Sequence, residues 1–214
     1  MKGLFIKDLL ILKSRKQLFL VVGFLAIMYA FLGMHAFAMQ FLGLLGASSV
    51  VSTLSYDFMD NGGTFLFALP FTRRQYLAEK YLISFGGGVV GIWIGLLVVA
   101  AGVATGNPIS GDELVTYLTV GVLIANFMVC FMIPLEIKFG AEQSRTAMFA
   151  VLACVLIIAV LVAKILPEAV VARLVVFFLC LSDVQIIAGI VVICLALLGI
   201  SVFLSNLFIK KKEF

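Results

Sequence analysis

Side chains that could carry out chemistry are few in this chain of 214 residues, and they do not form a known catalytic arrangement. His35 is the single histidine, whereas zinc-dependent proteolysis within a membrane needs at least two histidines on one helix. The sequence contains neither the G-x-S-x-G motif of serine hydrolases nor the G-x-x-x-x-G-K-S/T loop that binds ATP phosphates. We therefore expect no catalytic residues, no metal site and no bound cofactor in this chain.

The other sulfur and polar side chains lie mostly inside apolar stretches. Four cysteines lack the spacing of metal sites or disulfides, and we expect them to be small buried hydrophobes. They are Cys130, Cys154, Cys180 and Cys194. The polar residues in or beside these stretches are Gln40, Ser48, Ser49, Ser52, Asn126, Gln185 and Asn206. Hydrogen bonding between helices is the interpretation we favour for them, and contact with a substrate is the alternative.

The segment 57–80 combines charged residues with an apolar cluster. It opens with a polar turn that follows Asp57 and contains two consecutive glycines. The apolar cluster comprises Phe65, Leu66, Phe67, Leu69 and Pro70. Thr72 and Gln75 then fit a capping box, so a helix should begin near Arg73.

Two interpretations of this apolar cluster remain open, because it is too short to cross a membrane. An exposed apolar cluster in water usually marks a surface that binds another molecule. Alternatively, the cluster folds back onto the membrane surface, where Arg73 and Arg74 would meet lipid phosphates. Lys80 closes the segment in either case.

The surroundings of these residues are dominated by hydrophobic side chains. Hydrophobic residues make up 64% of the chain and charged residues 12%, compared with roughly 45–50% and 25% in soluble domains. A water-soluble domain of this size cannot bury so much apolar surface. We therefore expect an integral membrane protein, and we read its net charge of +4 as a topology signal and not as a sign of nucleic-acid binding.

Long stretches without charged residues define the expected elements. A helix needs roughly 20 apolar residues to cross a bilayer, and the lack of a period-two pattern favours helices over a β-barrel. We predict an all-α membrane protein with six transmembrane helices, at residues 17–35, 38–56, 82–104, 114–135, 146–164 and 184–208. A tight outer turn within residues 33–40 should join the first two.

The distribution of basic residues predicts the orientation. With six spans, both termini and all but two of the 15 Lys and Arg residues lie on one side. The two exceptions are Lys164 and Arg173, so the positive-inside rule places the termini in the cytoplasm. A seventh span at 165–182 would export the basic tail 210–212 and place Arg173 within the bilayer. We prefer a short re-entrant or interfacial helix on the outer face at 165–183.

Two further cytoplasmic features complete the single expected domain, which covers residues 1–214. Residues 1–16 carry five basic groups among apolar ones, and they are expected to form a weakly amphipathic helix at the membrane interface. Residues 136–146 are expected to form a second cytoplasmic loop, which is either a solvated loop or a second docking element. Its candidate contact residues are Glu136, Lys138, Gly140 and Arg145.

Glycines spaced four residues apart mark one face of the third expected span. Gly87, Gly91 and Gly95 lie on this face, where another helix backbone can approach closely. Packing within the chain and contact between two subunits both fit this pattern.

Several short motifs occur in the order found in a known family. They are Lys7-Asp8, Tyr56-Asp57, Leu69-Pro70-Phe71-Thr72-Arg73, Lys80-Tyr81, and Pro134 to Gly140 followed by Arg145. Over nearly its whole length the chain resembles the small ABC-2 type permeases of Gram-positive bacteria, which pair with a separate ATP-binding subunit.

The resemblance implies an ABC-2 exporter fold and a permease subunit in the bacterial plasma membrane. Two permease chains, expected to be identical, would assemble with two ATP-binding chains that carry ATP and Mg²⁺. Segment 57–80 would hold the coupling helix that docks on the ATPase, and 134–145 would be a lesser contact.

The same resemblance implies a substrate path and a substrate class. Spans two and five of both copies would surround the path, and members export peptides, antibiotics and other amphipathic compounds. The alternative function is a non-transporting membrane scaffold, or a sensor-associated protein, that binds cytoplasmic partners through the same loops.

Overall fold

The computed structural model describes residues 2–58, 62, 66, 71–106, 108–165 and 183–211. Every regular element within these ranges is helical, which agrees with the predicted fold class. The helices are α1 (Lys2–Ser14), α2 (Lys16–Phe31), α3 (His35–Phe58), α5 (Arg73–Ala104), α6 (Gly111–Phe139), α7 (Ala141–Ile165) and α9 (Asp183–Lys211). The outer element expected at 165–183 lies almost wholly outside the described residues.

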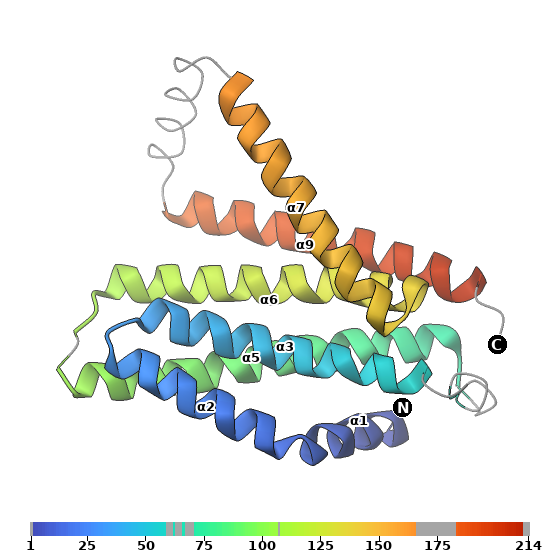
Figure 1. Ribbon diagram of the computed structural model, residues 1–214, viewed down its shortest axis with the longest axis horizontal. Helices are drawn as coiled ribbons and strands as arrows, with labels where there is room; N and C mark the ends of the chain where they lie inside the picture. The colour runs from blue at the N-terminus through green and yellow to red at the C-terminus, as the bar shows by residue number, and fades with distance from the viewer. Residues whose placement is uncertain are drawn as a thin grey trace.

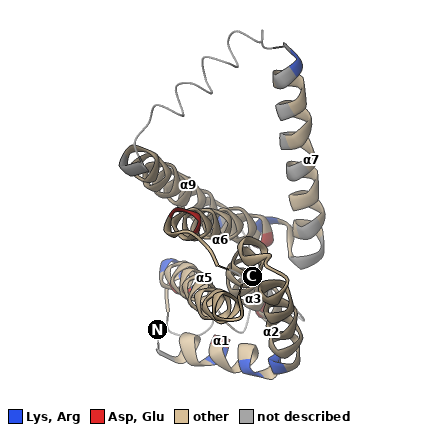
Figure 2. Ribbon diagram, turned by 90° about the vertical axis from the view of Figure 1, so that its left-hand side faces the viewer, with Lys and Arg blue, Asp and Glu red and all other residues tan. Residues whose placement is uncertain are grey.

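Helices α3, α5 and α6 form the centre of a bundle, with α2 on one side and α9 on the other (Figure 1). The main hydrophobic core lies between these central helices and includes Leu54, Leu77 and Ile133, all almost fully buried. Helix α7 packs mainly against α6 and then diverges from the bundle (Figure 2). The start of α1, the end of α9 and the first turn of α5 lie at the same end of the bundle (Figure 1).

Four of the described helices are long and apolar enough to cross a bilayer, namely α3, α5, α6 and α9. They establish a multi-pass membrane protein. The apolar stretch of α2 and that of α7, at 146–162, are shorter. Each of the six expected spans nevertheless coincides in position with one described helix.

The helix boundaries follow local sequence signals. The predicted capping box is present at the start of α5, where Thr72 and Gln75 bond each other's backbone N–H groups. A second capping box, from Ser110 and Glu113, starts α6. The turn between α2 and α3 is shorter than expected and centres on Gly33, whose φ of +79° is easily adopted by glycine.

The second cytoplasmic loop expected at 136–146 is much shorter in the structure. Helix α6 continues through Pro134 to Phe139, and α7 begins at Ala141. Only Gly140 separates them, with a φ of +81° that lets the chain leave the first helix. Proline within a helix of a membrane protein is tolerated because neighbouring groups satisfy the freed backbone carbonyl.

The glycine face packs within the chain. A Cβ added to Gly87 would lie 2.6 Å from the carbonyl oxygen of Gly46 on α3, and one added to Gly91 would lie 2.3 Å from that of Leu42. A Cβ on Gly95 would come within 3.1 Å of the Cα of Met39. The close approach of α3 and α5 therefore depends on these glycines.

Candidate functional site

The two ends of segment 57–80 lie next to each other, beside the N-terminal helix. Asp57 is in the last turn of α3, and Lys80 lies in the third turn of α5. Both side chains are almost fully buried, and so is that of Asp8 on α1. Together with Lys7 they form what we call the ion cluster, made of Lys7, Asp8, Asp57 and Lys80.

Lys80 is the centre of the ion cluster. Its Nζ lies 2.5 Å from Oδ2 of Asp8 and 2.8 Å from Oδ2 of Asp57, so it bridges α1 and α3. It also donates a hydrogen bond to Oγ1 of Thr53 at 3.0 Å. Lys7 forms a second ion pair with Asp57 and lies 3.4 Å from Oδ1 of Asp8. Two cations and two carboxylates thus balance in charge.

Hydroxyl groups add hydrogen bonds to the same carboxylate oxygens that Lys80 contacts, whereas Oδ1 of Asp8 accepts no hydrogen bond among the described residues. Tyr76 donates to Oδ2 of Asp57 at 2.9 Å, and Thr53 donates to Oδ2 of Asp8 at 3.0 Å. Burial of charges is tolerated where they are paired and hydrogen-bonded. Because its members come from α1, α3 and α5, the cluster holds these three helices in one register.

Glu79 is a further buried acidic residue in this polar region. Its side chain is fully buried beside Lys80 on α5, yet neither carboxylate oxygen has a hydrogen-bond partner among the described residues. An unpartnered buried carboxylate destabilises a fold. Glu79 therefore adds an acidic group to a region whose other charges are balanced.

A second contact ties the junction of α1 and α2 to α3. Arg15 donates to Oγ of Ser52 at 3.2 Å and to the hydroxyl of Tyr56. Its guanidinium also lies 4.9 Å from the centre of the Tyr56 ring, within range of a cation–π interaction. Helix α1 turns Asp8 inward and exposes apolar residues such as Leu9 and Leu10, as expected for a helix at a membrane interface.

Of the apolar cluster in segment 57–80, only Leu66 lies within the described residues. Phe65, Phe67, Leu69 and Pro70 fall outside them. Leu66 is buried in the main hydrophobic core with Leu54 and Leu77. It therefore anchors the segment to the bundle and differs from the exposed contact that the sequence led us to expect.

The two arginines of the segment have different surroundings. Arg73 donates to the backbone carbonyl oxygens of Ile209 and Lys210, at 2.8 and 3.2 Å, and so caps the end of α9. Arg74, next along the helix, is exposed. The start of α5 is thereby joined to the last turn of the chain's final described helix.

The residues expected to form a second contact lie near the same end of the bundle. Glu136 is buried and accepts a hydrogen bond from Ser55 of α3. Lys138 lies near the rings of Phe139 and Phe208, at 4.6 and 5.2 Å from their centres. Gly140 separates α6 from α7, and the side chain of Arg145 lies outside the described set.

The polar residues of the apolar stretches bond differently from our expectation. Ser48, Ser49 and Ser52 each donate to a carbonyl oxygen three residues earlier in their own helix. Ser52 also accepts the hydrogen bond from Arg15 that joins α3 to the α1–α2 junction, and other bonds between helices come from residues outside this polar set. Tyr81 of α5 bonds Ser201 and Ser205 of α9 at 2.6 and 2.9 Å, because its hydroxyl reaches across the helix interface.

The sequence comparison identifies the family. A family model described as ABC-2 family transporter protein matches residues 3–210, almost the entire chain. The chain belongs to this ABC-2 transporter family. It is thus a permease component of an ABC transporter, in agreement with the resemblance seen in its motifs. No curated protein and no solved structure matches the chain.

Within the ABC-2 chain, the ion cluster gives its short motifs a physical role. Lys7-Asp8 supplies one cation and one carboxylate, Asp57 the other carboxylate, and Lys80 the central cation. The sequence identified Asp57 and Lys80 as site residues, but their pairing with Asp8 was not expected. The signal in the sequence that could have indicated this pairing was the occurrence of oppositely charged residues at the edges of apolar stretches.

Proposed function

We propose that the chain is the permease of an ATP-driven exporter, with six spans, both termini in the cytoplasm and segment 57–80 as its docking element for a separate ATP-binding subunit. The observation that carries the proposal is the ion cluster. A docking segment can transmit force only if its ends are held firmly by the helices that must move. Asp57 and Lys80 hold both ends against α1 and against each other.

The proposed assembly contains two permease chains and two ATP-binding chains, which carry ATP and Mg²⁺. Apolar side chains on α7, such as Phe149 and Leu156, are largely exposed within the described part of the chain. A second copy of the permease would cover part of this surface. Peptides, antibiotics and similar amphipathic compounds are the proposed substrates, and the plasma membrane of a bacterium is the proposed location.

Replacing a single phenylalanine of the apolar cluster by aspartate tests the docking role of segment 57–80. Phe65→Asp or Phe67→Asp should abolish co-purification of the ATP-binding subunit and substrate-stimulated ATP hydrolysis, because a docking groove would have to bury a carboxylate. Membrane insertion should be unchanged. Unchanged co-purification of the two loop variants would contradict the proposal.

A further inference from the structure

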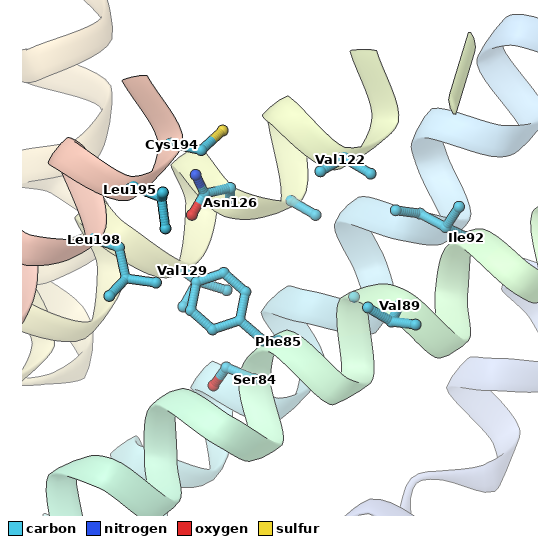
Figure 3. A pocket seen from close by; sticks show the side chains of 12 residues that line it. Ser84, Phe85, Val89, Ile92, Val122, Asn126, Val129, Cys194, Leu195 and Leu198 are labelled. Carbon is cyan, nitrogen blue, oxygen red and sulfur yellow. The ribbon is translucent and has the colours of Figure 1, made fainter. Parts of the chain in front are cut away.

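A pocket of about 230 Å³ lies between α5, α6 and α9, within the predicted bilayer region (Figure 3). Its wall is almost entirely apolar, with Phe85 and Ile92 on α5 and Leu198 on α9. An apolar cavity of roughly 150 Å³ in another protein holds one benzene molecule. The volume of this pocket therefore suits a ligand somewhat larger than a single ring.

Asn126 of α6 supplies a hydrogen-bond donor to this pocket. The residue is only 5% exposed, and Figure 3 shows its amide directed toward Cys194 and Leu195 of α9. Its Oδ1 accepts a hydrogen bond from Sγ of Cys130 at 3.2 Å, which leaves the NH₂ group to face the pocket. Within the described part of the chain, this NH₂ group has no acceptor.

The donor is unpaired but accessible from the pocket. Protein atoms do not fully enclose Nδ2 of Asn126. A buried donor without an acceptor loses the hydrogen bond it would make to water. A ligand that brings an acceptor into this apolar pocket would restore that bond, which gives the pocket a chemical preference.

The mouth of the pocket faces the surface that lipid would cover. Val89, Val122 and Leu195 line the pocket and are about half exposed or more. Since these helices are expected to cross the bilayer, a ligand would enter sideways from the membrane.

We propose that this pocket is a binding site for a small apolar compound with one hydrogen-bond acceptor, such as a carbonyl group, taken up from the lipid phase. The apolar wall selects the body of the ligand, and the NH₂ group of Asn126 selects its acceptor. The site lies on the third, fourth and sixth expected spans. It is therefore separate from the path that the family resemblance implies between spans two and five, and it does not depend on docking of an ATPase.

Benzophenone is a suitable probe, because it is an apolar ketone that forms covalent adducts under ultraviolet light. The full chain, purified in lipid nanodiscs, would be irradiated at increasing probe concentrations, and the adducts mapped by mass spectrometry. We expect saturable labelling of pocket residues on α5 and α9. Diphenylmethane has the same two rings without the carbonyl and makes no hydrogen bond. Its affinity for the pocket, measured by the concentration that suppresses benzophenone labelling, should be about three- to tenfold lower than that of benzophenone.

The variant Asn126→Leu removes the donor at similar size and should weaken benzophenone labelling by the same factor. Asn206→Leu is the matched control, since the Asn206 NH₂ group donates to the carbonyl of Val202 in its own helix. Cys130→Ala removes only the hydrogen bond from the Cys130 thiol to Oδ1 of Asn126 and keeps the NH₂ donor of Asn126. This variant should leave labelling unchanged.

A second variant keeps the test valid if Asn126→Leu does not fold. Val89→Phe adds bulk at the exposed mouth of the pocket and should reduce adducts inside it without disturbing the core. Equal competition by diphenylmethane, unchanged labelling of Asn126→Leu, or adducts spread evenly over all lipid-facing helices would overturn the proposal. A failure of ATPase docking would not affect these results.

Discussion

Removal of the central cation of the ion cluster should strongly destabilise the protein. Lys80→Met keeps a similar volume but leaves two buried carboxylates, Asp8 and Asp57, with Lys7 as their remaining cation. The Lys80 side chain is 2% exposed and has three oxygen partners within 3.0 Å. Removing one partner of a buried ion pair costs about 3–5 kcal/mol.

The expected loss can be read as a shift of the unfolding temperature. For a chain of this size, 1 kcal/mol corresponds to roughly 2–4 °C, so Lys80→Met should lower Tm by roughly 6–20 °C. Thermal unfolding in detergent, followed by fluorescence or size-exclusion chromatography, measures this shift. Lys13→Met, a change of the same type at an exposed position of α1, should shift Tm by less than about 2 °C.

A double variant distinguishes the unpaired charge from loss of packing. Asp8→Asn combined with Lys80→Met removes one carboxylate together with the cation, so Lys7 and Asp57 remain as a neutral pair. The double variant should be more stable than Lys80→Met alone. If Lys80→Met and Lys13→Met unfolded at the same temperature, the reasoning about the ion cluster would be refuted.

Two further predictions compare neighbouring positions. Gly91→Ala should separate α3 from α5 and lower Tm by several degrees, because its Cβ would lie 2.3 Å from the carbonyl oxygen of Leu42; Gly86→Ala, with no atom within 4 Å, should not. The measurement is thermal unfolding of both variants, and equal Tm values would contradict the packing argument. Arg73→Ala should expose the end of α9 to a protease that cleaves at its lysines, because two capping hydrogen bonds are lost. Arg74→Ala removes an exposed arginine and should leave the cleavage rate unchanged; equal rates for the two variants would refute the capping role.

The positions of the helices could be predicted from the sequence because charged residues interrupt the apolar stretches. The start of α5 followed from the Thr72 and Gln75 capping box. The same signal at Ser110 and Glu113 was present in the sequence but was not used. The loop at 136–146 was predicted too long, because the apolar stretch was taken to end before the charged residue Glu136, although α6 continues to Phe139 in the structure.

The site was predicted less completely than the helices. Asp57 and Lys80 stood out as charges that border apolar stretches, but pairing depends on the approach of α1, which is remote in sequence. A weak amphipathic pattern gave no sign that Asp8 faces inward. The glycine pattern predicted a close contact correctly, and only the structure identified Gly46 and Leu42 as the backbone partners.

The ion cluster also limits how the proposed docking segment can move. Separation of Lys80 from Asp8 and Asp57 would leave buried charges unpaired, at a cost of about 3–5 kcal/mol. This cost is at or above the upper end of the coupling free energy of allosteric ligands, typically about 1–3 kcal/mol. Displacement of segment 57–80 by a partner would therefore move α1, α3 and α5 together as a rigid unit. The glycine face brings the backbones of α3 and α5 into close contact and so adds packing between two helices of this unit. Motion within the permease is then expected at the interfaces of this unit with α6, α7 and α9.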